Sequence, residues 1–127
     1  MTKMANPAAI CTLQRRKKQE TNEDKFKFSV LGAVEESFSS LSNLDKQEIY
    51  FHLENAFMIS KQEIPFRMKD FVDAIEQIFG IGAKLIEIRI VEALHRRIPD
   101  FIYTPKRSVV TLKEYTASLR TFLLQPS

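Results

Sequence analysis

The 127-residue sequence contains one cysteine, three glycines and five prolines. The single cysteine, Cys11, excludes a disulfide framework and a zinc site built on several cysteines. No apolar run approaches the roughly 18 residues of a membrane-spanning helix. The first ten residues lack the charged and then apolar layout of a signal peptide. We therefore expect a cytoplasmic protein in a reducing environment, without a membrane span.

The net charge of +3 lies in the N-terminal segment. Residues 1–25 contain six basic and three acidic residues, whereas residues 26–127 contain 13 of each. Because residues 1–25 have no aromatic side chain and few large apolar ones, they cannot offset the entropy of ordering. The sequence predicts a flexible basic tail at residues 1–25 and a single helical domain at residues 26–127.

Four adjacent cations in this tail form a candidate nucleic-acid or anion-binding site. They are Arg15, Arg16, Lys17 and Lys18. Such a cluster attracts phosphate or anionic lipid headgroups. A solubilising leader or a linker to another module is the plainer interpretation of so short a basic run.

From residue 26 onward, apolar residues recur at helical spacing. This periodicity predicts an all-α fold of about five helices, in a compact bundle or an orthogonal array. The expected helices cover residues 29–41, 46–57, 68–79, 82–98 and 112–124. Capping boxes open the second helix (Asp45 with Glu48) and the last one (Thr111 with Glu114).

The connections between these helices carry further predictions. Pro65 disfavours helix at Ile64, so we expect residues 58–67 to form a loop that is extended there. Gly80 is expected to end the third helix in a left-handed cap, and Gly82 to let the next helix start close against it. Residues 101–110 predict a short β-hairpin.

The helix at residues 82–98 has apolar residues on two sides. One face holds Ala83, Ile86, Ile90, Ala93 and Leu94; on the other, Leu85, Ile88 and Val91 lie among Lys84, Glu87, Arg89, Glu92 and Arg96. Such a helix is central to its fold or shared with a partner. The candidate partner interface consists of Leu85, Ile88 and Val91, with Leu119 and Phe122 of the amphipathic last helix.

The sequence offers little chemistry for catalysis. His52 and His95 lie on different predicted helices without a recognised ligand spacing, so we expect neither a metal nor a cofactor. Cys11 has no local base to lower its pKa. The run at residues 80–84 lacks the full phosphate-loop spacing. We expect no enzyme activity.

An ordered set of short segments carries a resemblance to a known family. The segments are Ile49–Glu54, Glu63–Pro65, Phe71–Glu76, Ile78–Gly80, Gly82–Lys84 and Ile86–Glu87. Over about residues 29–98 the chain resembles the small helical output domain of ammonia-oxidising archaea, named after Nitrosopumilus. The resemblance implies an α-helical domain at the end of prokaryotic signalling proteins, after a sensor or receiver module, with no catalytic residues to carry over. The chain departs from the family in lacking an upstream sensor, in having Met68 where a proline is expected, and in its extension over residues 101–127.

The sequence thus predicts a non-enzymatic regulatory or output domain of archaeal signalling that acts through protein–protein contacts and forms a homodimer. One alternative is a DNA-associated transcriptional regulator that uses the basic tail, although Glu87 and Glu92 would repel phosphate at the fourth helix. Another is a small-ligand sensor with a pocket lined by Phe51, Phe57, Phe71 and Phe79. Core packing is the plainer interpretation of those four rings.

Overall fold

Five α-helices and two 3₁₀ turns make up the described part of the chain. The computed structural model describes residues 21–39, 46–104 and 111–125. The α-helices are α2 (Asn22–Ser39), α3 (Lys46–Phe57), α4 (Met68–Phe79), α5 (Ala83–Arg97) and α6 (Leu112–Leu124), and the 3₁₀ turns are η1 (Lys61–Phe66) and η2 (Gly80–Gly82). These ranges contain no β-strand, so the predicted all-α class is confirmed.

The described residues give no support to the predicted β-hairpin. Residues 101–104 form no strand, and residues 105–110 lie outside the described ranges. Asp45, the predicted cap of α3, also lies outside them.

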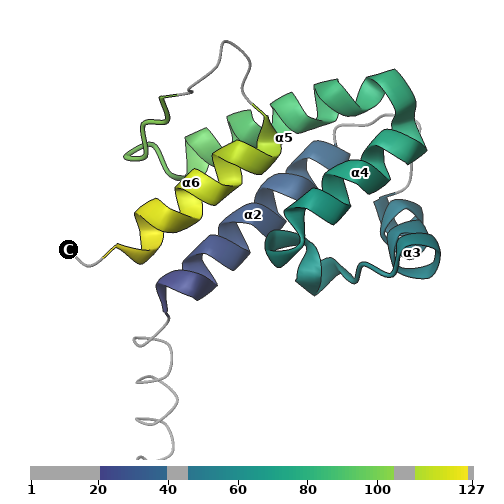
Figure 1. The fold of residues 1–127 in the computed structure, drawn as a ribbon, viewed down its shortest axis with the longest axis horizontal. Helices are drawn as coiled ribbons and strands as arrows, with labels where there is room; N and C mark the ends of the chain where they lie inside the picture. The colour runs from purple at the N-terminus through teal and green to yellow at the C-terminus, as the bar shows by residue number, and fades with distance from the viewer. Residues whose placement is uncertain (1–20, 40–45, 105–110, 126–127) are drawn as a thin grey trace, which may run out of the picture.

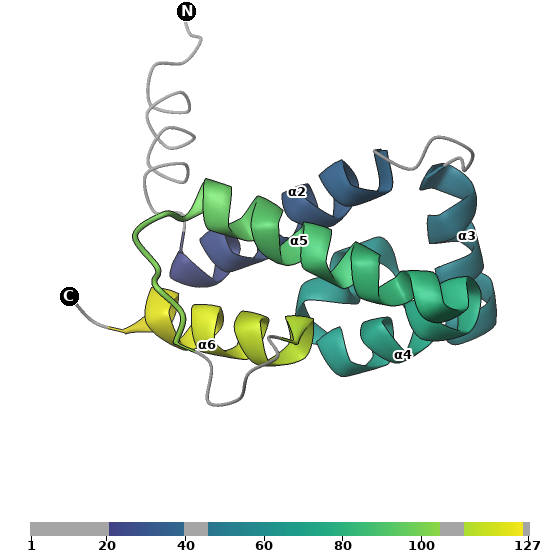
Figure 2. The same ribbon diagram turned by 90° about the horizontal axis from the view of Figure 1, so that it is seen from above.

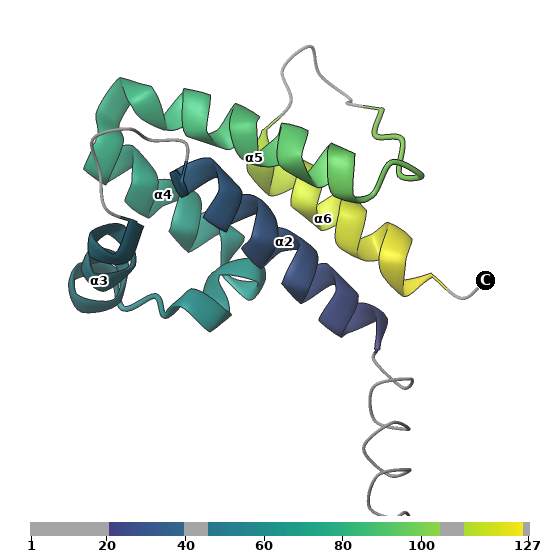
Figure 3. The same cartoon turned by 180° about the vertical axis from the view of Figure 1, so that it is seen from behind.

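The central helix is α2. It packs against α5, α6 and η1, and Figures 1 and 3 show it running alongside α6 while α3 lies at the far end of the molecule. Seven of its residues are buried, namely Phe26, Val30, Leu31, Ala33, Val34, Ser37 and Phe38. On the second apolar side of α5, Val91 packs against the edge of the core, whereas Leu85 and Ile88 are more than half exposed.

The first helix starts earlier than the sequence predicted, at Asn22 rather than Ser29. Thr21 caps it: the backbone N–H of Asp24 donates to Thr21 Oγ1 at 3.0 Å. Glu23, in the first turn, forms an ion pair of 2.8 Å with Arg120 on α6, and Phe26 is buried. Residues 22–25, which the sequence assigned to the tail, are therefore helical.

The connection between α3 and α4 is also more ordered than predicted. Ile64 is buried inside the 3₁₀ turn η1, and Pro65 lies in the same turn, so the predicted extended conformation is wrong. The φ angle that proline requires is also that of a 3₁₀ turn, and residue 64 is restricted but not barred from such a turn.

The turn between α4 and α5 uses one glycine for its backbone freedom. The bounds of α4 agree with the sequence, and Gly80 ends the helix with a positive φ of 59°. A Cβ on Gly82 would lie 3.9 Å from that of Phe79, an ordinary contact. The prediction that Gly82 is needed for a close approach is therefore wrong.

Candidate functional site

The two sides of α5 differ in burial, as the sequence predicted. Its inner face is buried against the core and consists of Ala83, Ile86, Ile90, Ala93 and Leu94. On the opposite side Leu85 is 52% exposed and Ile88 51% exposed, Val91 is half-buried, and Ile81 in the preceding turn is almost fully exposed. We call these four residues, Ile81, Leu85, Ile88 and Val91, the α5 outer face. Figure 2 looks down on α5 and shows no described helix across it.

The two candidate interface residues on α6 behave differently from those on α5. Leu119 is fully buried, so its assignment to a partner interface is wrong. The reason is that α6 packs against α2, α4 and α5 together. Phe122 is partly exposed and its ring lies 5.1 Å from that of Phe101. Phe122 therefore belongs to a separate aromatic cluster.

The basic end of α5 is joined to α2. Glu36 on α2 forms ion pairs with both Arg96 and Arg97, the latter at 3.3 Å. The Arg97 guanidinium passes over Gly32, where a Cβ would lie only 2.7 Å from Nη1. This pairing reduces the positive charge that α5 could offer to nucleic acid.

Glu87 lies in the core, although the sequence placed it on the polar side of α5. The residue is 6% exposed, and its Oε2 atom has no hydrogen-bond partner in the described part of the chain. Burial raises the pKa of this carboxyl, while Lys84 and the backbone N–H of Leu112 at the start of α6 act in the opposite direction. From the sequence, Glu87 was placed on the solvent-exposed side because it is charged, although it lies next to the buried apolar residues of α5.

A polar cluster centred on Glu35 joins α2, α3 and η1. The Glu35 carboxylate pairs with Lys46 at 2.7 Å and with Lys61 at 3.1 Å. It also accepts a hydrogen bond of 2.7 Å from the Tyr50 hydroxyl. These partners, Lys46 first, lower the pKa of Glu35 to about 2, while burial and Glu35 raise the pKa of Tyr50. The cluster holds helices together and presents no free nucleophile.

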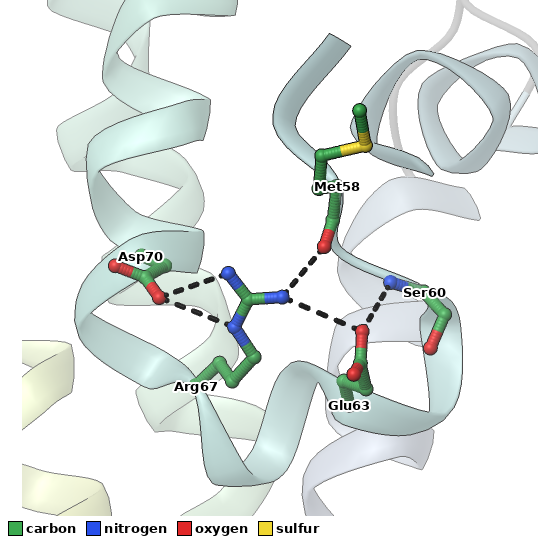
Figure 4. A network of polar contacts seen from close by, with 5 residues as sticks. All are labelled: Met58, Ser60, Glu63, Arg67 and Asp70. Atoms are coloured by element: carbon green, nitrogen blue, oxygen red, sulfur yellow. Dashed lines mark hydrogen bonds and ion pairs between the residues drawn. The ribbon is translucent and has the colours of Figure 1, made fainter. Parts of the chain in front are cut away.

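A second polar cluster fixes the entry to α4 (Figure 4). Arg67 donates to the backbone carbonyl of Met58 at 2.6 Å and lies within 3.1 Å of Asp70. Glu63 accepts the backbone N–H of Ser60 at 3.0 Å and pairs with Arg67 at 3.4 Å. The hydrogen bonds from Ser60 are the main cause of a lowered Glu63 pKa. Every group in this cluster has a structural partner.

An aromatic groove lies where α5, residues 101–104 and α6 meet. Its volume is about 580 Å³, and it is lined by Val91, Glu92, His95, Arg96, Ile102, Tyr103 and Tyr115. The ring of Tyr115 lies 5.4 Å from each of the rings of Phe101 and Tyr103. Burial raises the pKa of Tyr115. No pattern in the sequence indicated this groove, because its residues come from three separate segments.

The four phenylalanines proposed for a sensor pocket differ widely in exposure. Phe51 is 69% exposed, Phe71 is fully buried in the core, and Phe57 and Phe79 are half-buried. Phe71 lies in the hydrophobic core and Phe57 and Phe79 pack against it, which agrees with the plainer interpretation of core packing for these three rings.

The remaining candidates among the described residues add no further site. His52 packs edge-on against Phe57, and the described residues contain no group of three side chains suited to hold a metal. Cys11 and the basic cluster Arg15, Arg16, Lys17 and Lys18 lie outside the described ranges. None of the described helices combines the length and apolar character needed to cross a membrane.

Comparisons with known proteins returned no match. No protein-family model matches the chain, and the searches of curated proteins and of solved structures found none either.

Proposed function

We propose that the chain is a non-enzymatic regulatory domain that acts through protein–protein contact, and that it pairs with a second copy of itself along the α5 outer face. The observation that carries this proposal is the exposure of Leu85 and Ile88 on a helix whose opposite face already completes the core. Exposed apolar residues grouped on one helix face are typical of interaction sites. The signalling role and archaeal context rest on the resemblance to the output-domain family.

The spacing of the outer face suits a symmetric pair. A two-fold interface brings the same surface of each copy together. With the axis at Ile88 and the helices antiparallel, Leu85 lies level with Val91 of the partner subunit, three residues from the centre in each copy. The apolar residues of one copy therefore meet apolar residues of the other.

The charges beside this face are compatible with the same arrangement. Lys84 and Glu92 are both exposed and lie four residues on either side of Ile88. The two-fold axis places Lys84 opposite Glu92 of the partner subunit, so opposite charges lie next to each other across the interface. Complementary charge of this kind favours the correct register over others.

The proposal is tested by the mass of the full chain in solution, measured over a wide range of protein concentration. We expect a monomer–dimer equilibrium that Ile88→Glu shifts to monomer, because two carboxylates would meet at the axis. Phe51→Glu is the matched control: it adds the same charge at an exposed ring on α3 and should leave association unchanged.

A mixing experiment tests the symmetry. Ile88→Glu and Ile88→Lys should each be monomeric alone and should associate when mixed, because opposite charges then meet at the two-fold axis. A chain that stays monomeric at the highest concentration contradicts self-pairing. Failure of the mixture to associate contradicts the position of the axis.

A further inference from the structure

The aromatic groove and an exposed isoleucine lie at opposite ends of α5. Ile81, in the turn η2 that precedes the helix, is 95% exposed. The groove is lined by the last turns of α5, by α6, and by Ile102 and Tyr103 between them. Figure 2 shows the loop of residues 98–104 at one end of α5 and the connection to α4 at the other. An antiparallel pair of α5 helices brings such opposite ends together, and its two-fold symmetry does so twice.

The two-fold axis at Ile88 places Ile81 level with the groove of the partner subunit. Gly82 has helical backbone angles, with φ of −64° and ψ of −15°, so the turn η2 continues the course of α5 back to Ile81. Ile81 precedes Ile88 by seven residues, and His95 in the groove lining follows it by seven. At about 1.5 Å per residue, each lies roughly 10 Å from the axis along the helix. Ile81 therefore lies level with His95 of the partner subunit.

The two features also lie on matching sides of the helix. At roughly 100° per residue, Ile81 and Leu85 fall on one side of Ile88, whereas Val91 and His95 fall on the other. A two-fold rotation about an axis through Ile88 exchanges these sides as well as the two ends of the helix. The side of one copy that carries Ile81 therefore meets the groove side of the other. A parallel pair would instead bring Ile81 to Ile81 of the partner subunit.

The surfaces that meet in this arrangement are apolar. Ile102 in the groove lining is 82% exposed, and Tyr103 is half-buried. The groove volume of about 580 Å³ leaves room for an isoleucine side chain. Ile81 lies between Gly80 and Gly82, which have no side chains to hold the turn away from a partner. Removing these apolar surfaces from water favours association without any requirement for charge.

We propose that Ile81 of each copy docks in the aromatic groove of the other, against Ile102 and Tyr103, and that these two identical contacts fix the antiparallel direction of the pair. The inference rests on the proposed self-pairing and adds a second contact site to each copy. It requires a shallow crossing of the two α5 helices. At about 20° such helices stay in contact over several turns, whereas at about 50° their ends diverge.

Isotope-filtered NMR of the full chain tests the contact directly. Labelled and unlabelled copies are mixed at a concentration where pairs form, and only nuclear Overhauser effects between copies are recorded. We expect such effects between the Ile81 methyl groups of one copy and the Tyr103 ring or Ile102 methyl groups of the other. Effects between Ile81 and Ile81 of the partner subunit would show a parallel pair and overturn the inference.

Variants measure how much the contact contributes to pairing. Ile81→Ser and Ile102→Ser should each raise the dimer Kd by roughly tenfold or more, because every pair loses the contact twice. The double variant should be little weaker than either single one, since residues in contact do not contribute additively. Leu124→Ser is the matched control and should leave the Kd unchanged. Leu124 is exposed and follows Tyr115 by nine residues, which places it on the opposite side of α6 from the groove.

The outcomes separate the groove contact from the self-pairing itself. If Ile88→Glu abolishes pairing while Ile81→Ser and Ile102→Ser pair as tightly as the natural chain, the α5 outer face is supported and the groove contact is overturned. A loss with Ile81→Ser but none with Ile102→Ser also overturns it, because Ile81 then meets another surface. If the natural chain stays monomeric at the highest concentration, both proposals fail.

Discussion

The carboxylate of Glu35 accepts a hydrogen bond of 2.7 Å from the hydroxyl of Tyr50, and this contact joins α3 to the central helix. Lys46 and Lys61 pair with the same carboxylate. Together with the buried apolar residues Ile49 and Leu53 of α3, the ionised carboxylate of this one acid holds α3 on α2.

We predict that Glu35 makes the domain sensitive to acid. Its pKa is lowered from 4.5 to about 2, first by Lys46 and then by Tyr50. A pKa that is lower in the folded state stabilises the fold above pH 4.5 and loses this contribution as the pH falls toward 2. Since both lysines are substantially exposed, we expect about 1–2 kcal/mol rather than the full value.

Urea unfolding near neutral pH and near pH 3 measures this effect. Glu35→Gln should lower the free energy of unfolding at neutral pH and have a much smaller effect in acid. Glu54→Gln on the exposed side of α3 is the control and should change neither. An equal loss for Glu35→Gln at both pH values would contradict the assignment.

Glu87 should have the opposite dependence on pH. Burial raises its pKa, so its contribution to stability is full below the unfolded pKa and is lost as the pH rises through the folded one. Glu87→Gln keeps the shape and removes the charge. We expect it to stabilise the domain at neutral pH by about 0.5–1.5 kcal/mol, with no gain near pH 4.

Thermal unfolding of both proteins at the two pH values checks this prediction. Glu92→Gln makes the same change at an exposed position on the same helix and serves as the control. A loss of stability with Glu87→Gln at neutral pH would mean that the ionised carboxylate stabilises the start of α6.

The sequence predicted correctly those features of the structure that are determined by residues close together in the chain. The apolar stripe of α4 ends at Gly80, and that of α6 begins at the Thr111 cap, so these two boundaries follow from recognisable local signals. Leu85, Ile88 and Val91 of the α5 outer face were identified in the same way, because each lies about one helical turn from the next, whereas Ile81 was not.

The errors occur where a residue's position depends on a distant part of the chain. The first turn of α2 is held by the pair Glu23–Arg120, which no local pattern indicates. Leu119 could be recognised as buried only once α6 was known to touch three other helices. The aromatic groove was missed because Tyr115 meets Tyr103 and α5 only in the folded chain.

Met58 is a site of backbone strain that substitution should relieve. It is the described non-glycine residue with a positive φ, 57°, and its side chain is 73% exposed. Arg67 holds it there through the hydrogen bond to its carbonyl. Since glycine adopts this conformation without the cost of a Cβ, Met58→Gly should stabilise the domain by about 0.5–1 kcal/mol.

The melting temperature of Met58→Gly measures the gain. Met58→Ala is the matched control: it removes the same side chain but keeps the Cβ, and should give no gain. Equal effects of the two substitutions would show that the change in stability comes from loss of the methionine side chain and not from relief of backbone strain.

The two faces of α5 should differ sharply in what they contribute to stability. Ile90 is fully buried, while Ile88, two residues earlier, is half exposed. Ile90→Ala creates a cavity and should cost about 2–5 kcal/mol, whereas Ile88→Ala should change the stability of the monomer by less than about 0.5 kcal/mol. Chemical denaturation at low protein concentration, where self-pairing does not contribute, measures both. If Ile88→Ala cost as much as Ile90→Ala under these conditions, the outer face would be part of the core, and its availability to a partner would be refuted.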